Sequence, residues 1–459
     1  MMHRALSIVA AAAASRTATA YDNGSPTLRP LLGWESWCSV GPCRTDLCTE
    51  RQVMETVRAL RTTGLFAKGY KWVVLDNCWH PTRSAKGRLV PDPDRFPSGM
   101  KHLASYVHGH GMKFGLYTSA GARTCHHAWS PGSYGHFDSD AQTFAAWGVD
   151  YVKLDWCDRR TRREAAHFNL SRALNATGRP VVLELCRGPY IYEEDWGYAR
   201  DVAQIWRAAR DHHDDFASTL KQAPRRVVFR SSPRRRRDPR SSPRRHRDPP
   251  SQVAALENAT RLSGPHGWAY GDILMTGGQG CSTQSGLVDP YTGIMADPSK
   301  PSHCPKQSEA EYRTEVTLYA ILQSPLFLGT DPRNFTKLMA DLLLNDDMLF
   351  VNQDYKAEPA VVTSSCGRKA YIRRLSDGRV AFGATNLERN ATAVGICFDE
   401  FFRRHGPAPA AVRVKDVWAR TTSTHACCGW GNYSRDLAPH DTMFLLLDPR
   451  PLQGGKNQP

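Results

Sequence analysis

Short apolar runs alternate with amphipathic segments through the first three quarters of the chain. The runs have the length and β-branched content of strands, whereas the segments between them repeat apolar residues at helical spacing. Strands are expected at residues 31–37, 71–77, 113–119, 151–156, 180–186, 202–206, 271–276 and 326–330, with helices at 49–65, 101–110, 138–147, 160–174, from about 214, and at 311–323. Eight such repeats predict a (β/α)8 TIM barrel. A doubly wound open sheet is the alternative, but no glycine-rich phosphate loop follows the first strand.

The pattern changes from about residue 361. Alternating runs at 369–374 and 379–385 flank Ser376-Asp377-Gly378, which predicts a hairpin, and further short strands are expected at 412–418 and 442–447. The chain is therefore expected to comprise a barrel at 21–355, an antiparallel β-sandwich domain at 356–450 and a tail at 451–459.

Polar and aromatic side chains recur where the predicted strands end. On the fourth strand Lys153 and Asp155 project to the same side, because side chains alternate along a strand. Taken alone, these two residues fit a structural ion pair as well as a reactive site. The ends of the other strands carry Trp34, Asp76, Asn77, Tyr117, Arg207, Asp211 and Asp272. Their convergence on one barrel mouth favours a site, and carboxylates beside aromatic rings suit a sugar substrate.

The N-terminal segment, the cysteines and the glycosylation sequons indicate the cellular compartment of the protein. Residues 1–20 combine a charged start, an apolar run too short to span a bilayer and a small-residue ending, which predicts a secretory signal peptide. With 13 Cys and seven N-x-S/T sequons, including one at Asn23, the protein is expected to be secreted, or delivered to a lysosome- or vacuole-type compartment, and to be oxidised and glycosylated. Metal binding by the cysteines is the alternative, but no paired C-x-x-C elements support it.

The net charge of +15 is concentrated in one segment. Residues 224–250 hold 11 Arg and two acids, a net of +9, which leaves +6 for the rest of the chain. The segment contains a tandem decamer, RSSPRRRRDP followed by RSSPRRHRDP, and is expected to be a disordered surface insertion on the barrel face away from the active site. An Arg/Ser-type RNA-binding function is the alternative. No nucleic-acid or membrane partner is expected.

Several stretches resemble glycoside hydrolase family 27, the α-galactosidases (melibiases) and α-N-acetylgalactosaminidases. They include GWESWC, VVLDNCW, DAQTFAAWGVDYVKLDWC, IWRAARD, SPLFLGTD and VNQD, and they follow the family's order through nearly the whole chain after residue 30. The resemblance implies a (β/α)8 barrel with a C-terminal antiparallel β domain, a retaining mechanism, no cofactor and no metal. A homodimer is one assembly that we consider.

The resemblance also implies roles for individual residues. Asp155 corresponds to the nucleophile, and Asp211 to the general acid/base, with Asp214 and Asp215 as the other candidates for that role. The implied substrate-binding residues are Trp34, Asp76, Asn77, Tyr117, Lys153, Arg187, Arg207 and Asp272. Lys153 and Arg207 would favour an ionised Asp155, whereas Asp211 must hold a proton in the first step.

The chain departs from the family at residues that would touch the sugar. Asn77 stands where the family usually has Asp, Ala269 and Tyr270 stand where it has Asn and Asp, and Arg187 lies in the loop that selects the substrate. An exo-acting α-galactosidase is the first hypothesis. The alternatives are an α-N-acetylgalactosaminidase, a β-L-arabinopyranosidase and an inactive carbohydrate-binding homologue.

The same resemblance implies some of the covalent features. It implies disulfides Cys38–Cys78, Cys43–Cys48 and Cys125–Cys157, while Cys186 lacks the family's partner; Cys281–Cys304 is suggested by proximity. Glycosylation is expected at Asn169, Asn175, Asn258, Asn334, Asn390 and Asn432.

Overall fold

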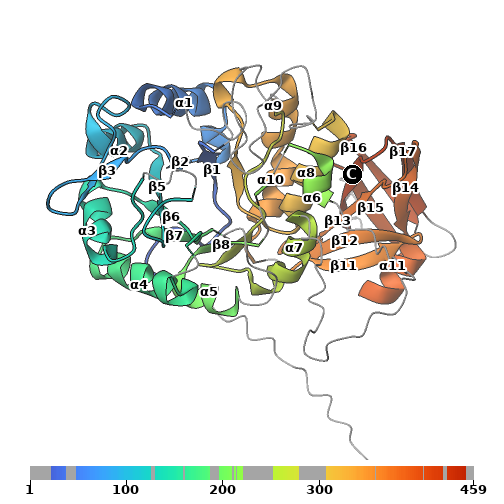
Figure 1. The fold of residues 1–459 in the computed structure, drawn as a ribbon. Helices are drawn as coiled ribbons and strands as arrows, with labels where there is room; N and C mark the ends of the chain where they lie inside the picture. Colours follow the sequence, from blue (N-terminus) through green and yellow to red (C-terminus); the bar gives the residue numbers. More distant parts are fainter. Residues whose placement is uncertain are drawn as a thin grey trace, which may run out of the picture.

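A computed structural model describes residues 22–37, 48–125, 130–158, 161–186, 196–208, 211–212, 214–220, 252–278, 307–356, 358–406, 408–426 and 432–450. The expected signal peptide at 1–20, the 224–250 segment, the expected tail at 451–459, Arg187 and the side chain of Asn258 lie outside this part of the chain. The described chain forms a barrel, which runs from blue to yellow in Figure 1, and a β domain coloured orange to red beside it.

Eight parallel strands form the barrel wall, as the alternating pattern predicts. They are β1 (Leu32–Glu35), β2 (Trp72–Leu75), β5 (Lys113–Ser119), β6 (Tyr151–Asp155), β7 (Val182–Leu185), β8 (Ile205–Arg207), β9 (Trp268–Tyr270) and β10 (Leu326–Leu328). The sheet order is β10-β1-β2-β5-β6-β7-β8-β9. Leu274 closes the ring, because its N–H donates to Phe327 O at 2.7 Å and its carbonyl accepts from Gly329 N at 2.9 Å.

The seventh strand differs from its predicted position at 271–276. It lies earlier, at Trp268–Tyr270, because Asp272 has a φ of 84° and this left-handed backbone interrupts the pairing. The chain then returns to the sheet at Leu274. An apolar pattern cannot reveal such a break, since it reports burial and not backbone angles.

Helices and short strands fill the connections around the barrel. The α-helices are α1 (Glu50–Thr62), α2 (Gly99–Gly109), α3 (Phe137–Trp147), α4 (Arg163–Ala176), α5 (Ala199–Val202), α6 (Phe216–Leu220), α7 (Gln252–Ala259), α8 (Glu309–Ile321), α9 (Lys337–Leu343) and α10 (Asp346–Gln353). Single turns of 3₁₀-helix lie at Phe66–Lys68, Trp196–Tyr198, Thr260–Leu262 and Pro332–Asn334, and β3 (Thr82–Arg83) pairs with β4 (Leu89–Val90). Local sequence sets the helix starts: Thr49 accepts from Gln52 N, and Ser308 forms a capping box with Glu311.

The C-terminal domain is an antiparallel β-sandwich with one short helix. Its elements are β11 (Val361–Ser365), β12 (Arg368–Arg374), β13 (Val380–Thr385), β14 (Thr392–Cys397), α11 (Phe398–His405), β15 (Ala411–Asp416), β16 (Thr421–Ala426), β17 (Asn432–Leu437) and β18 (Thr442–Asp448). A six-stranded sheet, β11-β12-β13-β18-β15-β16, faces the pair β14–β17 across a core that includes Phe382, Ile396 and Phe398.

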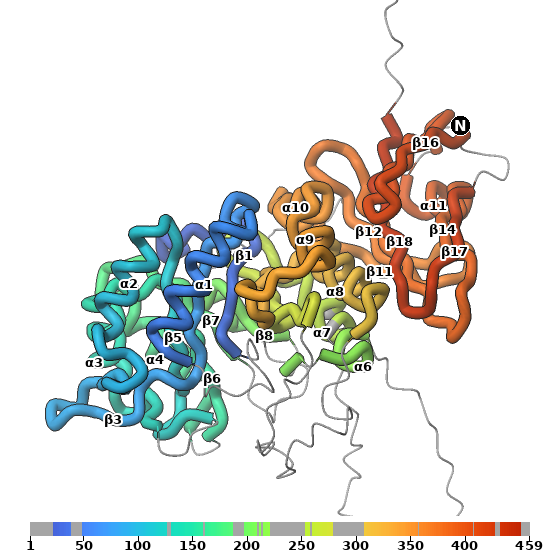
Figure 2. Tube along the Cα trace, turned by 90° about the horizontal axis from the view of Figure 1, so that it is seen from above, coloured from blue at the N-terminus to red at the C-terminus, as the bar shows by residue number. Residues whose placement is uncertain are grey.

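Helix α8 joins the two domains, and Figure 2 shows it between them. A Cβ atom at Gly383 of β13 would lie 2.7 Å from Ile321 Cδ1, so the Ile321 side chain packs directly on the backbone of the strand at this glycine. Arg313 of α8 makes two hydrogen bonds to Asp441, at 3.0 and 2.9 Å. These contacts fix the β domain against the barrel.

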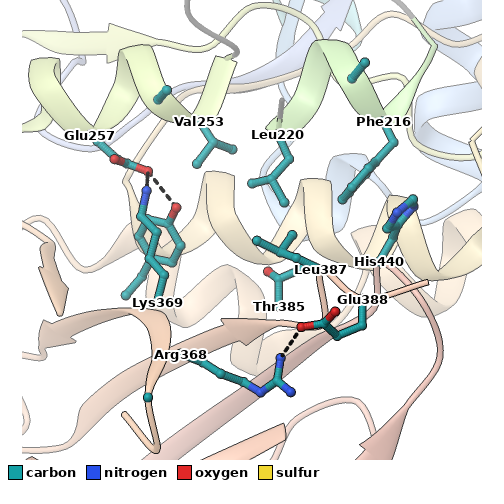
Figure 3. A pocket seen from close by; sticks show the side chains of 14 residues that line it. Phe216, Leu220, Val253, Glu257, Arg368, Lys369, Thr385, Leu387, Glu388 and His440 are labelled. Carbon is teal, nitrogen blue, oxygen red and sulfur yellow. Dashed lines mark hydrogen bonds and ion pairs between the residues drawn. The ribbon is translucent and has the colours of Figure 1, made fainter. Parts of the chain in front are cut away.

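A groove of about 600 Å³ lies beside this junction (Figure 3). Its barrel side is formed by α6 and α7, and its other side by the β domain. Glu257 of α7 accepts hydrogen bonds from Lys369 Nζ at 2.7 Å and from the Tyr371 hydroxyl at 2.6 Å, so these polar groups hold the domains together. Phe216 stacks on His440 with ring centroids 4.0 Å apart.

The disulfides correct part of the prediction. Cys48 pairs with Cys78 at a Cα–Cα distance of 6.2 Å, so the expected pairs Cys38–Cys78 and Cys43–Cys48 are both wrong, because each cysteine forms one disulfide. The start of α1 brings Cys48 beside the chain that leaves β2. The Cys125–Cys157 pair is as expected. Cys366–Cys397 was not predicted, and Cys281 and Cys304 lie outside the described residues.

The surface positions bear on the compartment prediction. Asn169, Asn334, Asn390 and Asn432 are exposed and Asn175 is partly exposed, so carbohydrate could be attached without disturbing the core. None of the helices in the described ranges has the length and apolar character that a bilayer crossing needs.

Candidate active site

Strand register brings the predicted site residues to one end of the barrel. Tyr117 lies opposite Lys153, and Ser119 opposite Asp155, on adjacent strands β5 and β6. On the other side of β6, Lys153 lies opposite Glu184 of β7. The parallel strands therefore present their last inward side chains at the same level.

Asp155 is fixed at the end of β6 by two donors. Its Oδ2 accepts from the Tyr117 hydroxyl at 2.9 Å, and its Oδ1 accepts from Trp156 N at 2.9 Å. Burial and the nearby Asp155 carboxylate raise the pKa of Tyr117 well above its usual value, so this hydroxyl remains a donor. A carboxylate held in this way has a set orientation at the barrel mouth.

Lys153 lies between two acids beneath Asp155. Its ammonium binds Asp76 Oδ2 at 2.8 Å and also contacts Glu35 Oε1. All three side chains are at most 5% exposed. Burial opposes the charge on Lys153, but Asp76 and Glu35 raise its pKa well above the usual value, so it is a cation.

Arg207 joins the other carboxylates of the site. Its Nη2 donates to Asp211 Oδ1 at 2.9 Å and lies 3.0 Å from Asp272 Oδ2, and its Nη1 donates to Cys186 Sγ at 3.2 Å. The Asp211 side chain is 37% exposed, whereas that of Asp272 is 4% exposed. Burial raises the pKa of Asp272 although Arg207 opposes the shift.

The alternatives to Asp211 have other partners. Asp214 accepts from the Tyr312 hydroxyl at 2.8 Å and from Gln307 N at 3.2 Å. Asp215 accepts from Ser218 N at 2.6 Å, at the start of α6. This placement favours Asp211 as the carboxyl group that faces the site.

Trp34 and Asn77, two of the predicted binding residues, are buried like the other described members of the site. Trp34 is buried, and its indole N–H donates to Thr330 O at 3.1 Å. Asn77 is also buried, and neither atom of its amide has a hydrogen-bond partner within the described part of the chain. Arg187 lies outside the described residues.

Three residues at the site were not predicted as contributors there. Glu35, Glu184 and Cys186 point inward at the ends of β1 and β7. The signal was present in the sequence, because a Glu in each of two otherwise apolar strands stands at an inward position. Cys186 is a free, buried thiol, and burial raises its pKa well above the usual value.

One cluster of possible metal ligands coincides with the site. Donor atoms of Cys125, Asp155 and Cys157 lie within 4.8 Å of one another. The two cysteines form a disulfide, however, and a disulfide supplies no thiolate ligand. The cluster is therefore a covalent brace beside Asp155.

Fold and site together define a sugar-processing type of (β/α)8 barrel, with paired carboxylates and two buried cations at the carboxyl ends of the strands. Residues 26–255 match the family described as alpha galactosidase A, and residues 367–447 match the alpha galactosidase C-terminal beta sandwich domain. The chain belongs to glycoside hydrolase family 27, the α-galactosidase family.

The similarity to known proteins extends along most of the chain. Alpha-galactosidase A of Cellvibrio japonicus is 30% identical over 407 residues, which cover 86% of this chain and 85% of that protein. The crystal structure of alpha-galactosidase I from Mortierella vinacea superposes with a TM-score of 0.71 at 24% identity, covering 94% of this chain and all of that one. A GH27 β-L-arabinopyranosidase from Geobacillus stearothermophilus shares the fold. It superposes with a TM-score of 0.69 at 21% identity, and the superposition covers 94% of this chain and 98% of that chain.

Proposed function

We propose that this protein is a secreted, exo-acting, retaining α-galactosidase that removes terminal α-D-galactosyl residues from oligosaccharides or glycoconjugates. The observation that carries the proposal is the orientation of Asp155, whose two oxygens are held by Tyr117 and by Trp156 N. Asp211, the proposed partner carboxyl group, is held by Arg207. Relatives named alpha-galactosidase support the choice of sugar.

The reaction needs two displacements. In the first, Asp155 attacks the anomeric carbon, the glycosidic C–O bond breaks, and Asp211 donates its proton to the departing oxygen. In the second, Asp211 accepts a proton from water, which attacks the anomeric carbon and releases Asp155. Retaining enzymes place the two carboxyl groups about 5–5.5 Å apart, and this spacing is expected here.

The remaining polar groups bind the sugar in this proposal. Lys153 donates to ring hydroxyls, Asp76 accepts from the 4- or 6-hydroxyl, and Arg207 contacts the 2-hydroxyl. Because Lys153 and Arg207 are buried cations, they favour the ionised form of Asp155 by Coulombic attraction. No cofactor takes part in the proposed reaction.

Asn77 favours a second candidate within the same family. An amide replaces a carboxylate acceptor there, and both of its polar atoms are buried. This change would suit a pentose such as L-arabinopyranose, which lacks the 6-hydroxyl group, and the shared fold of the arabinopyranosidase is compatible with it. An α-N-acetylgalactosaminidase recognises a different group at the 2-position of the sugar, and the family resemblance assigns Arg187 to the loop that selects the substrate.

A panel of nitrophenyl glycosides tests the proposal. Release of nitrophenol is expected from the α-galactoside at a higher kcat/KM than from the α-N-acetylgalactosaminide or the β-L-arabinopyranoside. Asp155→Asn should lower kcat by at least about 10³-fold without unfolding the protein. Asp138→Asn is the matched control, since the Asp138 side chain is 76% exposed on α3. A folded protein that turns over none of the three substrates would refute the proposal.

Secretion and glycosylation have separate tests. Expression in a eukaryotic host should give a protein that is secreted into the culture medium and begins near residue 21. Treatment with an N-glycanase should lower its mass by removing N-linked glycans. Retention of residues 1–20 or an unchanged mass would contradict these two parts of the proposal.

A further inference from the structure

A buried histidine directly follows Asp211, the proposed acid/base. His212 is buried although the segment around it also carries Asp211, Asp214 and Asp215. Both nitrogens of its ring are hydrogen-bonded. The proposed mechanism does not use this ring, so its burial beside a candidate catalytic group needs a physical reason.

The ring of His212 bridges two elements from different parts of the chain. Its Nδ1 lies 2.8 Å from the carbonyl oxygen of Ile273, and because a carbonyl only accepts, Nδ1 carries a proton and donates. Its Nε2 is hydrogen-bonded to Thr219 Oγ1 of α6 at 3.0 Å. Glu315 Oε1 of α8 is farther from Nδ1, at 3.4 Å. The ring is therefore held between α6 and the segment that follows β9.

Helix α6 is a fixed partner for this ring. Thr219 is fully buried, and its Oγ1 also contacts Gln307 Oε1 at 3.1 Å. At the start of the same helix, Phe216 stacks on His440 of the β domain (Figure 3). The ring of His212 is thus anchored to a helix that packs against both domains.

The backbone of His212 makes a third contact, to the carboxyl group of Asp272. The His212 N–H donates to Asp272 Oδ2 at 2.7 Å. The same oxygen lies 3.0 Å from Arg207 Nη2, which also donates to Asp211 Oδ1 at 2.9 Å. Asp211 is therefore tied to Asp272 twice, through Arg207 and through the peptide group that it shares with His212.

The segment that His212 contacts has an unusual backbone. The φ of Asp272 is 84°, a left-handed conformation that a residue other than glycine keeps only when its surroundings hold it. His212 holds this segment at two points, because its N–H reaches the Asp272 side chain and its ring reaches the Ile273 carbonyl. The acid/base segment and the chain after β9 therefore fix each other.

We propose that His212 is a positioning residue for the general acid/base, which fastens the 211–212 peptide to Asp272 and Ile273 and so sets the place of the Asp211 carboxyl group. The inference rests on the proposed function. The Asp211 side chain is partly exposed, so hydrogen bonds rather than close packing must hold it. Misplacement of this carboxyl group would weaken proton delivery to the departing oxygen more than it weakens sugar binding.

The need for this proton depends on the leaving group. Fluoride departs without protonation, whereas the methoxy group of a methyl glycoside departs only with a proton from the acid. Loss of folded protein or of sugar binding would lower kcat/KM on both substrates alike. The test therefore compares the glycosyl fluoride and the methyl glycoside of whichever sugar the nitrophenyl panel selects.

Substitutions at His212 separate hydrogen bonding from packing. His212→Asn keeps a donor near the place of Nδ1, and its kcat/KM should stay within about threefold of wild type on both substrates. His212→Leu has no donor, and it should lower kcat/KM on the methyl glycoside about 10- to 100-fold and on the fluoride less than about threefold. If His212→Leu does not fold, His212→Gln, whose amide reaches the place of Nε2 instead, should show the same selective loss.

His108→Leu is the matched control. His108 of α2 is hydrogen-bonded through Nε2 to Asp150 at 2.6 Å. Asp150 directly precedes β6 and so lies at the end of that strand opposite to Asp155. This variant should lose stability and keep the wild-type ratio of kcat/KM for the two substrates. Asp211→Asn is the reference for a lost acid and should show the selective loss in its largest form.

The outcomes distinguish this inference from the proposed function. Equal losses on both substrates in His212→Leu or His212→Gln, or a His212→Asn variant as impaired as these, would overturn the positioning role alone. A selective loss in His108→Leu would overturn it too. An Asp211→Asn variant without the selective loss would reject the acid assignment. If the wild-type protein turns over neither substrate, the hydrolase proposal fails and this inference fails with it.

Discussion

Removal of the Cys125–Cys157 disulfide should weaken both stability and catalysis. The bond closes a loop with a sequence separation of 32. Loop-closure entropy for such a loop corresponds to about 4 kcal/mol at 25 °C. The Cys125→Ser/Cys157→Ser variant should therefore lose about that much free energy of unfolding.

The same variant should also lose activity, because the disulfide braces the nucleophile. Cys125 N donates to the Tyr117 hydroxyl at 3.4 Å, and that hydroxyl donates to Asp155 Oδ2 at 2.9 Å. Without the brace, Tyr117 and Asp155 have more freedom, and small displacements of reacting groups cost up to about 10²-fold in rate. We expect kcat/KM on nitrophenyl α-galactoside to fall 10- to 100-fold.

The Cys366–Cys397 disulfide is a close control. Its sequence separation is 31, so the entropic contribution is almost the same, but it lies in the β domain. Cys366→Ser/Cys397→Ser should lose about 4 kcal/mol in urea unfolding and keep wild-type kinetics well below its transition temperature. Equal kinetics for both double variants would refute the brace, and a stability difference above about 2 kcal/mol would refute the entropic reasoning.

Four further substitutions test the surroundings of the site and the contact between the two domains. Burial raises the pKa of Glu315 to about 8, so the folded protein keeps a proton that the unfolded chain loses. The contribution of Glu315 to stability should therefore be full below about pH 4.5 and fall by about 5 kcal/mol between pH 4.5 and pH 8, and urea unfolding of Glu315→Gln should show a weaker pH dependence. Tyr270→Phe should change the free energy of unfolding by less than about 0.5 kcal/mol, since the Tyr270 hydroxyl has no partner in the described ranges. Tyr319→Phe should lower it by about 1 kcal/mol, because the Tyr319 hydroxyl donates to a backbone carbonyl at 2.7 Å. A larger loss for Tyr270→Phe than for Tyr319→Phe would contradict the assigned contacts. Arg313→Met should cost about 1–3 kcal/mol by breaking the bidentate pair with Asp441, and a double-mutant cycle that gives no coupling would show that the pair does not hold the domains together.

The sequence by itself determined the architecture of this protein. Apolar runs and helical periodicity gave eight barrel strands and the antiparallel character of the C-terminal domain, because both follow from which side of an element is buried. The sequence also located the candidate site at one end of the barrel, since polar residues at the carboxyl ends of parallel strands meet there regardless of the loop conformations. Stretches along most of the chain, including the one around Asp155, carried the resemblance to the family that the match over residues 26–255 shows.

Tertiary structure decided the contacts that depend on distance between separate elements. Cys78 pairs with Cys48 because the start of α1 lies beside it, a proximity that spacing along the chain does not encode. The left-handed backbone at Asp272 moved the seventh strand toward the N-terminus. The partners of Lys153 also required coordinates: Glu35 reaches it from 118 residues away, across the barrel interior. Local pattern fixes which face a side chain occupies, whereas only the closed barrel decides which side chains it meets there.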